Sequence, residues 1–285
     1  MTLPRILLNK WNIDAKKQLG QHFLNDRSVA KNIAIISGVT ADEVVLEIGA
    51  GLGALTIPLA GIAKKVYAVE KDSRLIPLLE NEFIVNDLHN IIIVNKNILN
   101  VDINQLGETE GRKILVIGNL PYNISSQILV HLINSRKAIS SAVLMFQAEL
   151  ARRITAEPNC KDYGRLTVML RHCSEIKKIL SLKGSSFFPS PKVDSEVIEV
   201  KFHHLVKNIV NDESFFFKLI KAAFGQRRKI LKNALAGSEL YIDKATAEQV
   251  LENSDIDPLK RAENLTVSDF ARLSNNMEKA LAGIS

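Results

Sequence analysis

Short apolar runs alternate with amphipathic stretches along the first two-thirds of the chain. The stretches, such as residues 55–65 and 73–85, repeat apolar residues three and four positions apart, as amphipathic helices do. The runs are short and rich in valine and isoleucine, which is typical of buried strands, and they occupy residues 44–48, 65–70, 91–94, 113–118 and 142–147. This alternation predicts βαβ units and therefore an α/β fold with a mostly parallel, doubly wound sheet.

The pattern changes after a last extended run at residues 195–204. A polar, turn-prone segment follows, and from Phe215 onward the spacing of apolar residues is helical, without another strand pattern. We therefore expect two domains. Residues 1–206 would form the sheet domain with a basic N-terminal arm, and residues 207–285 a small all-helical domain.

Composition narrows the class of protein. No apolar run approaches the roughly 20 residues that span a bilayer, so we expect no membrane contact and no signal peptide. Cys160 and Cys173 are too few for a disulfide framework, which favours a reducing, cytoplasmic setting. The adjacent His203 and His204 have no cysteine or carboxylate at ligand spacing, so we expect no metal. The net charge of +6 fits an anionic partner such as nucleic acid.

A glycine-rich loop joins the first predicted strand to the helix after it. Gly49, Gly51 and Gly53 allow the backbone to adopt positive φ and to approach a ligand closely. The second predicted strand ends on Glu70, a carboxylate placed to accept hydrogen bonds from both hydroxyls of a ribose. The loop and this acid predict a nucleotide-like cofactor, but they leave a nicotinamide dehydrogenase and a methyltransferase open.

The tetrapeptide Asn119-Leu120-Pro121-Tyr122 favours methyl transfer. It follows a buried strand, where ligands of open α/β sheets bind. Pro121 has no N–H, so an amide carbonyl and a backbone carbonyl can converge there and accept both hydrogens of the adenine amino group. Such bonds favour a pyramidal nitrogen whose lone pair can attack a methyl group, and Tyr122 offers a ring on which the extruded base can stack.

These motifs resemble the dimethyladenosine transferases of small-subunit rRNA, the kasugamycin-sensitivity family of class I methyltransferases. The resemblance implies a Rossmann-like class I methyltransferase sheet followed by a small helical domain. It also implies S-adenosylmethionine-dependent N6,N6-dimethylation of two adjacent adenosines in the 3′-terminal hairpin of 16S rRNA. The expected partner is the rRNA in a pre-30S particle, and the protein is expected to be a monomer that serves ribosome biogenesis. The stretches that carry the resemblance are residues 16–26, 47–56, 118–129, 163–172 and 187–197.

The resemblance also implies roles for individual residues. Asn97 stands where the family usually has an aspartate that faces the adenine of the cofactor. Phe187 would lie on the far side of the target base from Tyr122, and with Asn119, Leu120 and Pro121 these residues would form the catalytic set. The implied cofactor-binding residues are His22, Leu24, Gly49, Gly51, Glu70, Asn97 and Asn119.

A run of one charge sign marks the start of the helical region. Six basic residues and no acidic ones lie between Lys218 and Lys232. If this whole run is helical, its charges fall on exposed faces, where they can contact RNA phosphates. The predicted RNA-binding residues are Lys221, Arg227, Arg228, Lys229 and Lys232.

Three other classes of protein share some of these features. An erythromycin-resistance methyltransferase, which modifies one adenine of 23S rRNA, has a similar glycine loop and a similar Asn119-Leu120-Pro121-Tyr122 motif. A non-catalytic RNA-binding assembly factor could keep the same fold, although intact Glu70 and Asn119 argue for catalysis. A dehydrogenase would need an acid/base group for hydride transfer near the fourth strand, and the tetrapeptide offers none.

Overall fold

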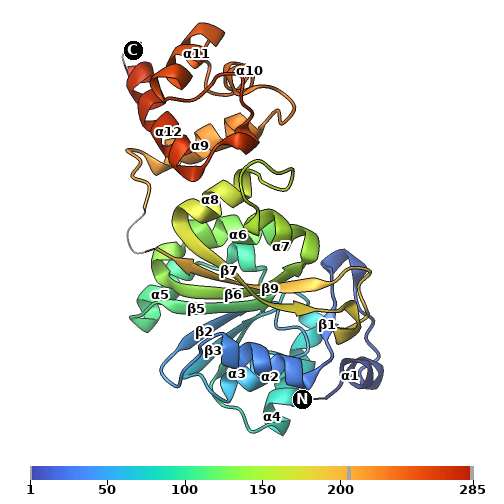
Figure 1. The fold of residues 1–285 in the computed structure, drawn as a ribbon. Coiled ribbons are helices and arrows are strands. Elements are labelled where there is room, and N and C mark those ends of the chain that lie inside the picture. Colours follow the sequence, from blue (N-terminus) through green and yellow to red (C-terminus); the bar gives the residue numbers. More distant parts are fainter. Residues whose placement is uncertain (1, 204–206, 283–285) are drawn as a thin grey trace. The chain divides into compact units, whose positions relative to one another are not determined.

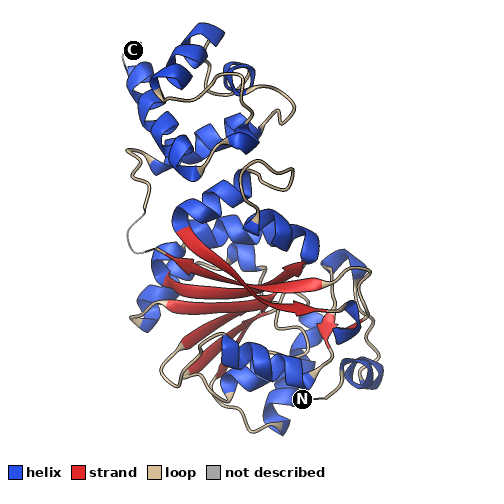
Figure 2. Cartoon of the chain, viewed as in Figure 1, coloured by secondary structure: helices blue, strands red, loops and turns tan. Residues whose placement is uncertain are grey.

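The computed structural model describes residues 2–203 and 207–282. Its main feature is a seven-stranded sheet in the order β4-β3-β2-β5-β6-β9-β7, with helices on both faces (Figure 1, Figure 2). The pairs β2–β3, β2–β5, β3–β4 and β5–β6 are parallel, and β9 runs antiparallel to β6. The predicted doubly wound α/β sheet is confirmed.

The strands agree with most of the expected runs. Their bounds are β1 Phe23–Leu24, β2 Val44–Ile48, β3 Lys65–Val69, β4 Ile91–Val94, β5 Ile114–Asn119, β6 Ile139–Gln147, β7 Ser174–Leu182, β8 Phe187–Phe188 and β9 Ser195–Phe202. Strand β7 was not expected from the sequence, because its edge position leaves most of its side chains partly or fully exposed and its sequence polar. The pair β1–β8 forms a separate two-stranded sheet that no local pattern predicts.

The helices at the stretches 55–65 and 73–85 are shorter than their amphipathic patterns suggested. Those of the N-terminal part are α1 Pro4–Lys10, α2 Arg27–Ile36, α3 Thr56–Ala60, α4 Ile76–Val85, α5 Ile103–Glu110, α6 Ser125–Asn134 and α7 Ala148–Thr155. Those that follow are α8 Arg165–Cys173, α9 Glu213–Phe224, α10 Leu231–Ala236, α11 Lys244–Asn253 and α12 Val267–Ala282. The expected helix at 55–65 is thus only the five residues of α3, which ends at Gly61. No described helix has the length and apolar character needed to cross a membrane.

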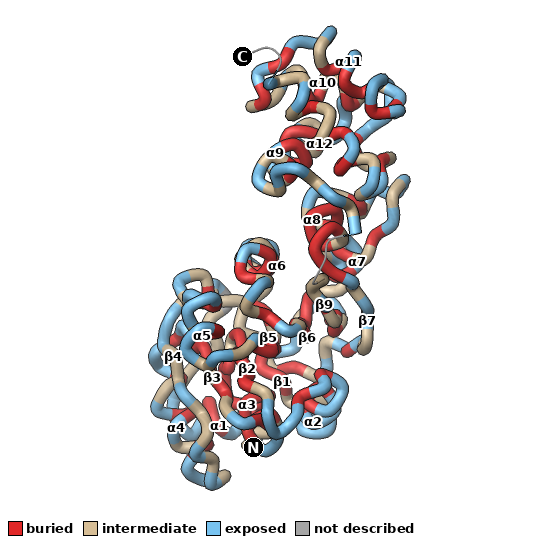
Figure 3. The backbone as a smooth tube through the Cα atoms, turned by 90° about the vertical axis from the view of Figure 1, so that its left-hand side faces the viewer, coloured by how far each residue is buried: buried red, intermediate tan, exposed pale blue. Residues whose placement is uncertain are grey.

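The largest core cluster lies between the sheet and helices α2 and α3. Alternate residues of β5, such as Leu115 and Ile117, pack with Ile33 of α2 and Leu59 of α3. The other face of the same strand carries Ile114 and Val116, which are also fully buried. Because both faces of the sheet are covered, the sequences of its central strands are nearly continuous apolar runs. Figure 3 shows that these strands are largely buried.

Contacts divide the described chain into two compact units. The first contains residues up to Ala151 together with Ile176–Phe202, and the second contains Arg152–Glu175 together with the residues from His203 onward. Helix α8 therefore belongs to the second unit, in which it contacts α9 and α12, although the strands that precede it in the sequence belong to the first unit. The predicted boundary after residue 206 adjoins residues 204–206, which lie outside the described residues, as does His204.

Candidate active site

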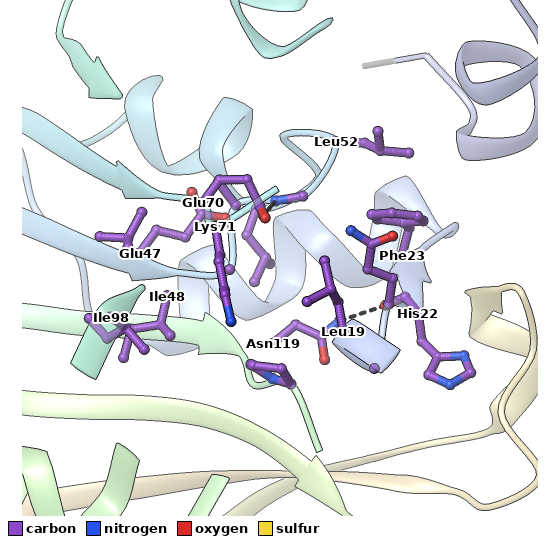
Figure 4. A pocket seen from close by; sticks show the side chains of 18 of the residues that line it. Leu19, His22, Phe23, Glu47, Ile48, Leu52, Glu70, Lys71, Ile98 and Asn119 are labelled. Atoms are coloured by element: carbon purple, nitrogen blue, oxygen red, sulfur yellow. Dashed lines mark hydrogen bonds between the residues drawn. The ribbon is translucent and has the colours of Figure 1, made fainter. Parts of the chain in front are cut away.

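An open pocket lies at the carboxyl ends of strands β2, β3 and β5. Its space amounts to about 960 Å³ when the open solvent at its mouth is included. Figure 4 shows the side chains around it, which come from segments far apart in the sequence. The predicted residues that line it are His22, Leu24, Gly49, Gly51, Glu70, Asn97, Asn119 and Pro121.

The glycine loop approaches the Asn119 segment very closely. Gly49 has a φ of 76°, and a β-carbon on it would lie 3.2 Å from the carbonyl oxygen of Asn119. Strand β5 comes equally near to β2, since a β-carbon on Gly118 would lie 2.5 Å from the carbonyl oxygen of Ile48. These contacts require glycine at both positions and place the predicted cofactor loop directly beside the predicted catalytic motif.

Glu70 is held rigidly at the end of β3. Its two carboxylate oxygens accept hydrogen bonds from the backbone N–H groups of Gly51, at 2.9 Å, and Asp72, at 2.7 Å. Burial raises the pKa of Glu70, with the neighbouring charge of Asp72 acting in the same direction. Each oxygen has a second lone pair, so the carboxylate can still accept bonds from a ribose.

A segment near the N-terminus crosses over the Asn119 motif. The side-chain nitrogen of Asn119 donates to the carbonyl oxygen of His22 at 2.8 Å, and Asn123 donates to that of Gln18 at 3.2 Å. Because the Asn119 nitrogen is engaged in this way, its amide oxygen is left as the acceptor. The structure therefore supplies the orientation of the amide that amine activation needs.

The sequence analysis also expects a backbone carbonyl of this motif to act as a second acceptor. The carbonyl oxygen of Pro121 already accepts bonds from the backbone N–H of Ile124, at 3.2 Å, and from the hydroxyl of Ser125, at 2.9 Å. The side chain of Leu120 is buried, which anchors the motif in the core while its backbone follows Asn119. The side chain of Leu120 is thus a core residue and is not among those that line the pocket.

The two predicted stacking rings differ in accessibility. Tyr122 is half-buried, its ring is stacked on that of His22 with centroids 5.4 Å apart, and its hydroxyl lies 3.3 Å from that of Ser195. Phe187 is only 3% exposed and packs in the main core. Base stacking needs an exposed ring face, so in this conformation Phe187 is a core residue, and the half-buried Phe188 beside it has the more accessible ring.

Asn97 keeps the local role that an aspartate would have at this position. It caps the short helix Ile98–Asn100 by accepting a bond from the backbone N–H of Leu99 at 3.2 Å. Its amide oxygen has a second lone pair, so it can also accept from an adenine amine. Lys71 and Lys96, which the sequence analysis did not single out, are exposed and also line the pocket.

Glu47 is a pocket residue that sequence reasoning missed. It is 1% exposed, and its oxygen Oε2 has no hydrogen-bond partner among the described residues. Burial, reinforced by the nearby charge of Glu70, raises the pKa of Glu47 to about 7. The available signal was its place as the acid two residues before Gly49, in a strand whose other residues are all apolar.

Substituting Glu47 by glutamine is expected to raise the free energy of unfolding at pH 8 but not at pH 4. The pKa is higher in the folded state, so the protonated acid stabilises the fold below its ordinary pKa of 4.5, and this contribution is lost as the pH rises through about 7. The loss amounts to about 3 kcal/mol on the usual conversion. Urea unfolding at both pH values would measure it, with Glu108→Gln on the exposed surface as control. An equal effect of Glu47→Gln at both pH values would contradict the prediction.

The basic run is not helical throughout, although its apolar residues keep helical spacing. Helix α9 ends at Phe224 and α10 begins at Leu231, so residues 225–230 form a turn. Three of the predicted RNA-binding residues form ion pairs: Lys221 with Glu239, Arg227 with Glu263 and Lys232 with Glu248. Arg228 and Lys229 are exposed, with no ion pair recorded to any described residue. The strongest candidates for RNA contact are therefore the two residues in the turn.

Within residues 2–203 and 207–282 no group of histidine, cysteine, aspartate and glutamate side chains has the geometry of a metal site. His203 is half-buried, and burial lowers its pKa. The described geometry thus consists of an open pocket, a carboxylate held by two backbone N–H groups and an oriented amide oxygen.

Comparisons with known proteins extend over nearly the whole chain. Residues 12–279 match the family model described as Ribosomal RNA adenine dimethylase. A protein of Desulforapulum autotrophicum named Ribosomal RNA small subunit methyltransferase A is 50% identical over 275 residues, which is 96% of each chain. The structure of a dimethyladenosine transferase from Plasmodium falciparum is 27% identical with a TM-score of 0.77, over 91% of this chain and 98% of that one. The structure of the 23S rRNA methyltransferase ErmE is 24% identical with a TM-score of 0.66, over 90% and 99%.

Proposed function

This chain belongs to the ribosomal RNA adenine dimethylase family, and we propose that the residues around its pocket carry out the reaction of that family. The protein is a methyltransferase that dimethylates adenosine in small-subunit rRNA and uses S-adenosylmethionine. The predicted family, Rossmann-like fold, enzyme class and cofactor are confirmed. The large-subunit alternative is not favoured, since likeness to the 23S enzyme at 24% identity shows the fold alone.

The pocket fits an adenosyl cofactor. The residues that would hold it are Glu70 at the ribose, Asn97 at the adenine amine and the glycine loop, where a side chain on Gly49 would press against the carbonyl oxygen of Asn119. His22 and Leu24 would cover it from the segment near the N-terminus. When bound, S-adenosylmethionine supplies an electrophilic methyl group. Glu70 supports this proposal most directly, because it is a buried, pre-oriented carboxylate with lone pairs facing the pocket.

The oriented amide of Asn119 carries the proposed catalytic step. Its oxygen and the carbonyl oxygen of Leu120 would accept the two hydrogens of the adenine amine, which raises the electron density on the attacking nitrogen as positive charge develops. Pro121 keeps donors away from this position because it has no N–H. The half-buried rings of Tyr122 and Phe188 would border the base after it leaves its stack.

The finer features of the substrate are part of this proposal. We propose that the enzyme works in the cytoplasm as a monomer and modifies two adjacent adenosines of the 3′-terminal hairpin in a pre-30S particle. The exposed Arg228 and Lys229 support an RNA backbone contact, since phosphate binding requires cations that are not already paired.

The test is methyl transfer from labelled S-adenosylmethionine to small and large ribosomal subunits that lack the modification, followed by nuclease digestion. We expect dimethyladenosine in the 3′ hairpin of the small subunit. Label in large-subunit RNA would instead support the resistance-type enzyme. Intact cofactor binding without transfer to either subunit would identify a non-catalytic assembly factor.

A further inference from the structure

Arg227 ties together three segments of the second unit. Its Nη2 donates to the carbonyl oxygens of Lys161, at 2.7 Å, and Tyr163, at 3.1 Å. The same nitrogen lies 3.2 Å from the carboxylate of Glu263. One end of the guanidinium group thus contacts three acceptors on two other segments of the chain. The backbone of Arg227 belongs to a third segment, the turn 225–230.

The same three segments are joined by further bonds. The backbone N–H of Asn159 donates to the carbonyl of Glu263 at 2.8 Å, and the Asn264 side chain donates to that of Asn159 at 3.0 Å. The backbone N–H of Leu231 donates to the carbonyl of Lys260 at 2.7 Å. The turn 225–230 is therefore one edge of a bonded loop cluster.

The cluster is anchored in the core of the second unit. Tyr163, whose carbonyl receives the Arg227 bond, has a fully buried side chain. Its ring lies 6.3 Å from that of Phe224, the last residue of α9 before the turn. Arg227 thus connects the turn after α9 to a segment that is anchored in the core at Tyr163. The guanidinium therefore limits the conformations of the turn.

We propose that Arg227 is a positioning residue, which fixes the turn so that Arg228 and Lys229 meet the RNA backbone. The inference rests on the proposed function and assigns Arg227 a role other than the phosphate contact expected from the sequence. Its Nη2 is already engaged by Glu263 and by two carbonyl oxygens, so it would have to leave these contacts in order to bind a phosphate. Arg228 and Lys229, the next two residues, have exposed side chains.

A double-mutant cycle on the full chain separates positioning from contact. The dissociation constant for unmethylated small subunits would be measured for Arg227→Gln, for Arg228→Gln with Lys229→Gln, and for all three together. We expect Arg227→Gln to weaken binding about tenfold alone, but less than twofold when the other two are already replaced. Equal weakening in both backgrounds would overturn the proposal, because it would show an independent phosphate contact.

Two charge variants test the same point without relying on one substitution. Arg227→Lys keeps the charge, but the lysine side chain is shorter by one bond, so its nitrogen would not lie where Nη2 meets the three acceptors, and the variant should weaken binding as Arg227→Gln does. Glu263→Gln removes a negative charge; it should weaken binding if Arg227 positions the turn and tighten binding if Arg227 contacts phosphate. Tighter binding by Glu263→Gln, or unchanged binding by Arg227→Lys, would overturn the proposal.

The outcomes also distinguish failure of this inference from failure of the proposed function. Circular dichroism and the dissociation constant of S-adenosylmethionine should be unchanged in every variant, which would show that the fold is intact. If the substitutions had additive effects while the native protein methylated small subunits as proposed, only the positioning role of Arg227 would be rejected. If replacing Arg228 and Lys229 left binding and its salt dependence unchanged, the turn would have no RNA contact to position, and the inference would be rejected together with that contact.

Discussion

Replacing Asn119 by alanine is expected to slow methyl transfer about 100- to 1,000-fold, the usual effect of removing one oriented polar group that stabilises developing charge. The substitution removes the amide oxygen that would accept from the adenine amine and also the bond to the His22 carbonyl. The dissociation constant of S-adenosylmethionine should change by less than about tenfold, since one hydrogen bond contributes about 1 kcal/mol. Single-turnover transfer to small subunits and calorimetric cofactor binding would measure the two effects separately.

Asn100→Ala is a suitable control, because this exposed asparagine lies on the short helix beside the pocket and is not among the residues that line it. Near-normal turnover of the Asn119 variant would show that amine activation does not depend on this amide. Loss of cofactor binding to the same extent as loss of transfer would assign Asn119 to the cofactor and not to the chemical step.

Replacing Glu70 by glutamine is expected to weaken S-adenosylmethionine binding about 100-fold. Hydrogen bonds to a charged group contribute about 1.5–3 kcal/mol each, and about 1.4 kcal/mol corresponds to a factor of ten. The variant would also turn an amide N–H toward the backbone N–H of Gly51 or Asp72, so the glycine loop would lose one of its supports. Calorimetric titration with the cofactor gives the dissociation constant directly.

A cofactor analogue that lacks one ribose hydroxyl shows whether Glu70 acts through the ribose. The analogue should bind the native protein more weakly than S-adenosylmethionine does, whereas the Glu70→Gln protein should discriminate much less between the two. Equal discrimination by both proteins would show that the carboxylate supports the loop only. Glu80→Gln, an exposed carboxylate on α4, provides the matched control.

The strands of the first unit and the cofactor motif were predictable because their signals are local. Buried parallel strands need apolar residues on both faces, and the loop after β2 needs positive φ, so both leave a readable pattern. Strand β7 left no such pattern. It lies at the edge of the sheet, most of its side chains are partly or fully exposed, and its sequence is therefore largely polar. The turn at 225–230 left no clear signal either, because apolar residues keep helical spacing on both sides of it.

The sequence by itself determined the family and the class of reaction, and it predicted most of the residues that we propose hold the cofactor. Glu70 and Asn119 lie at strand ends, and parallel strands bring their carboxyl ends to one edge whatever the loops do. Burial, hydrogen-bond partners and charge compensation depend on residues distant in the chain, so only the tertiary structure decided them. It placed Phe187 in the core, raised the pKa of Glu47 inside the pocket, and paired Arg227 with Glu263 while leaving Arg228 and Lys229 exposed.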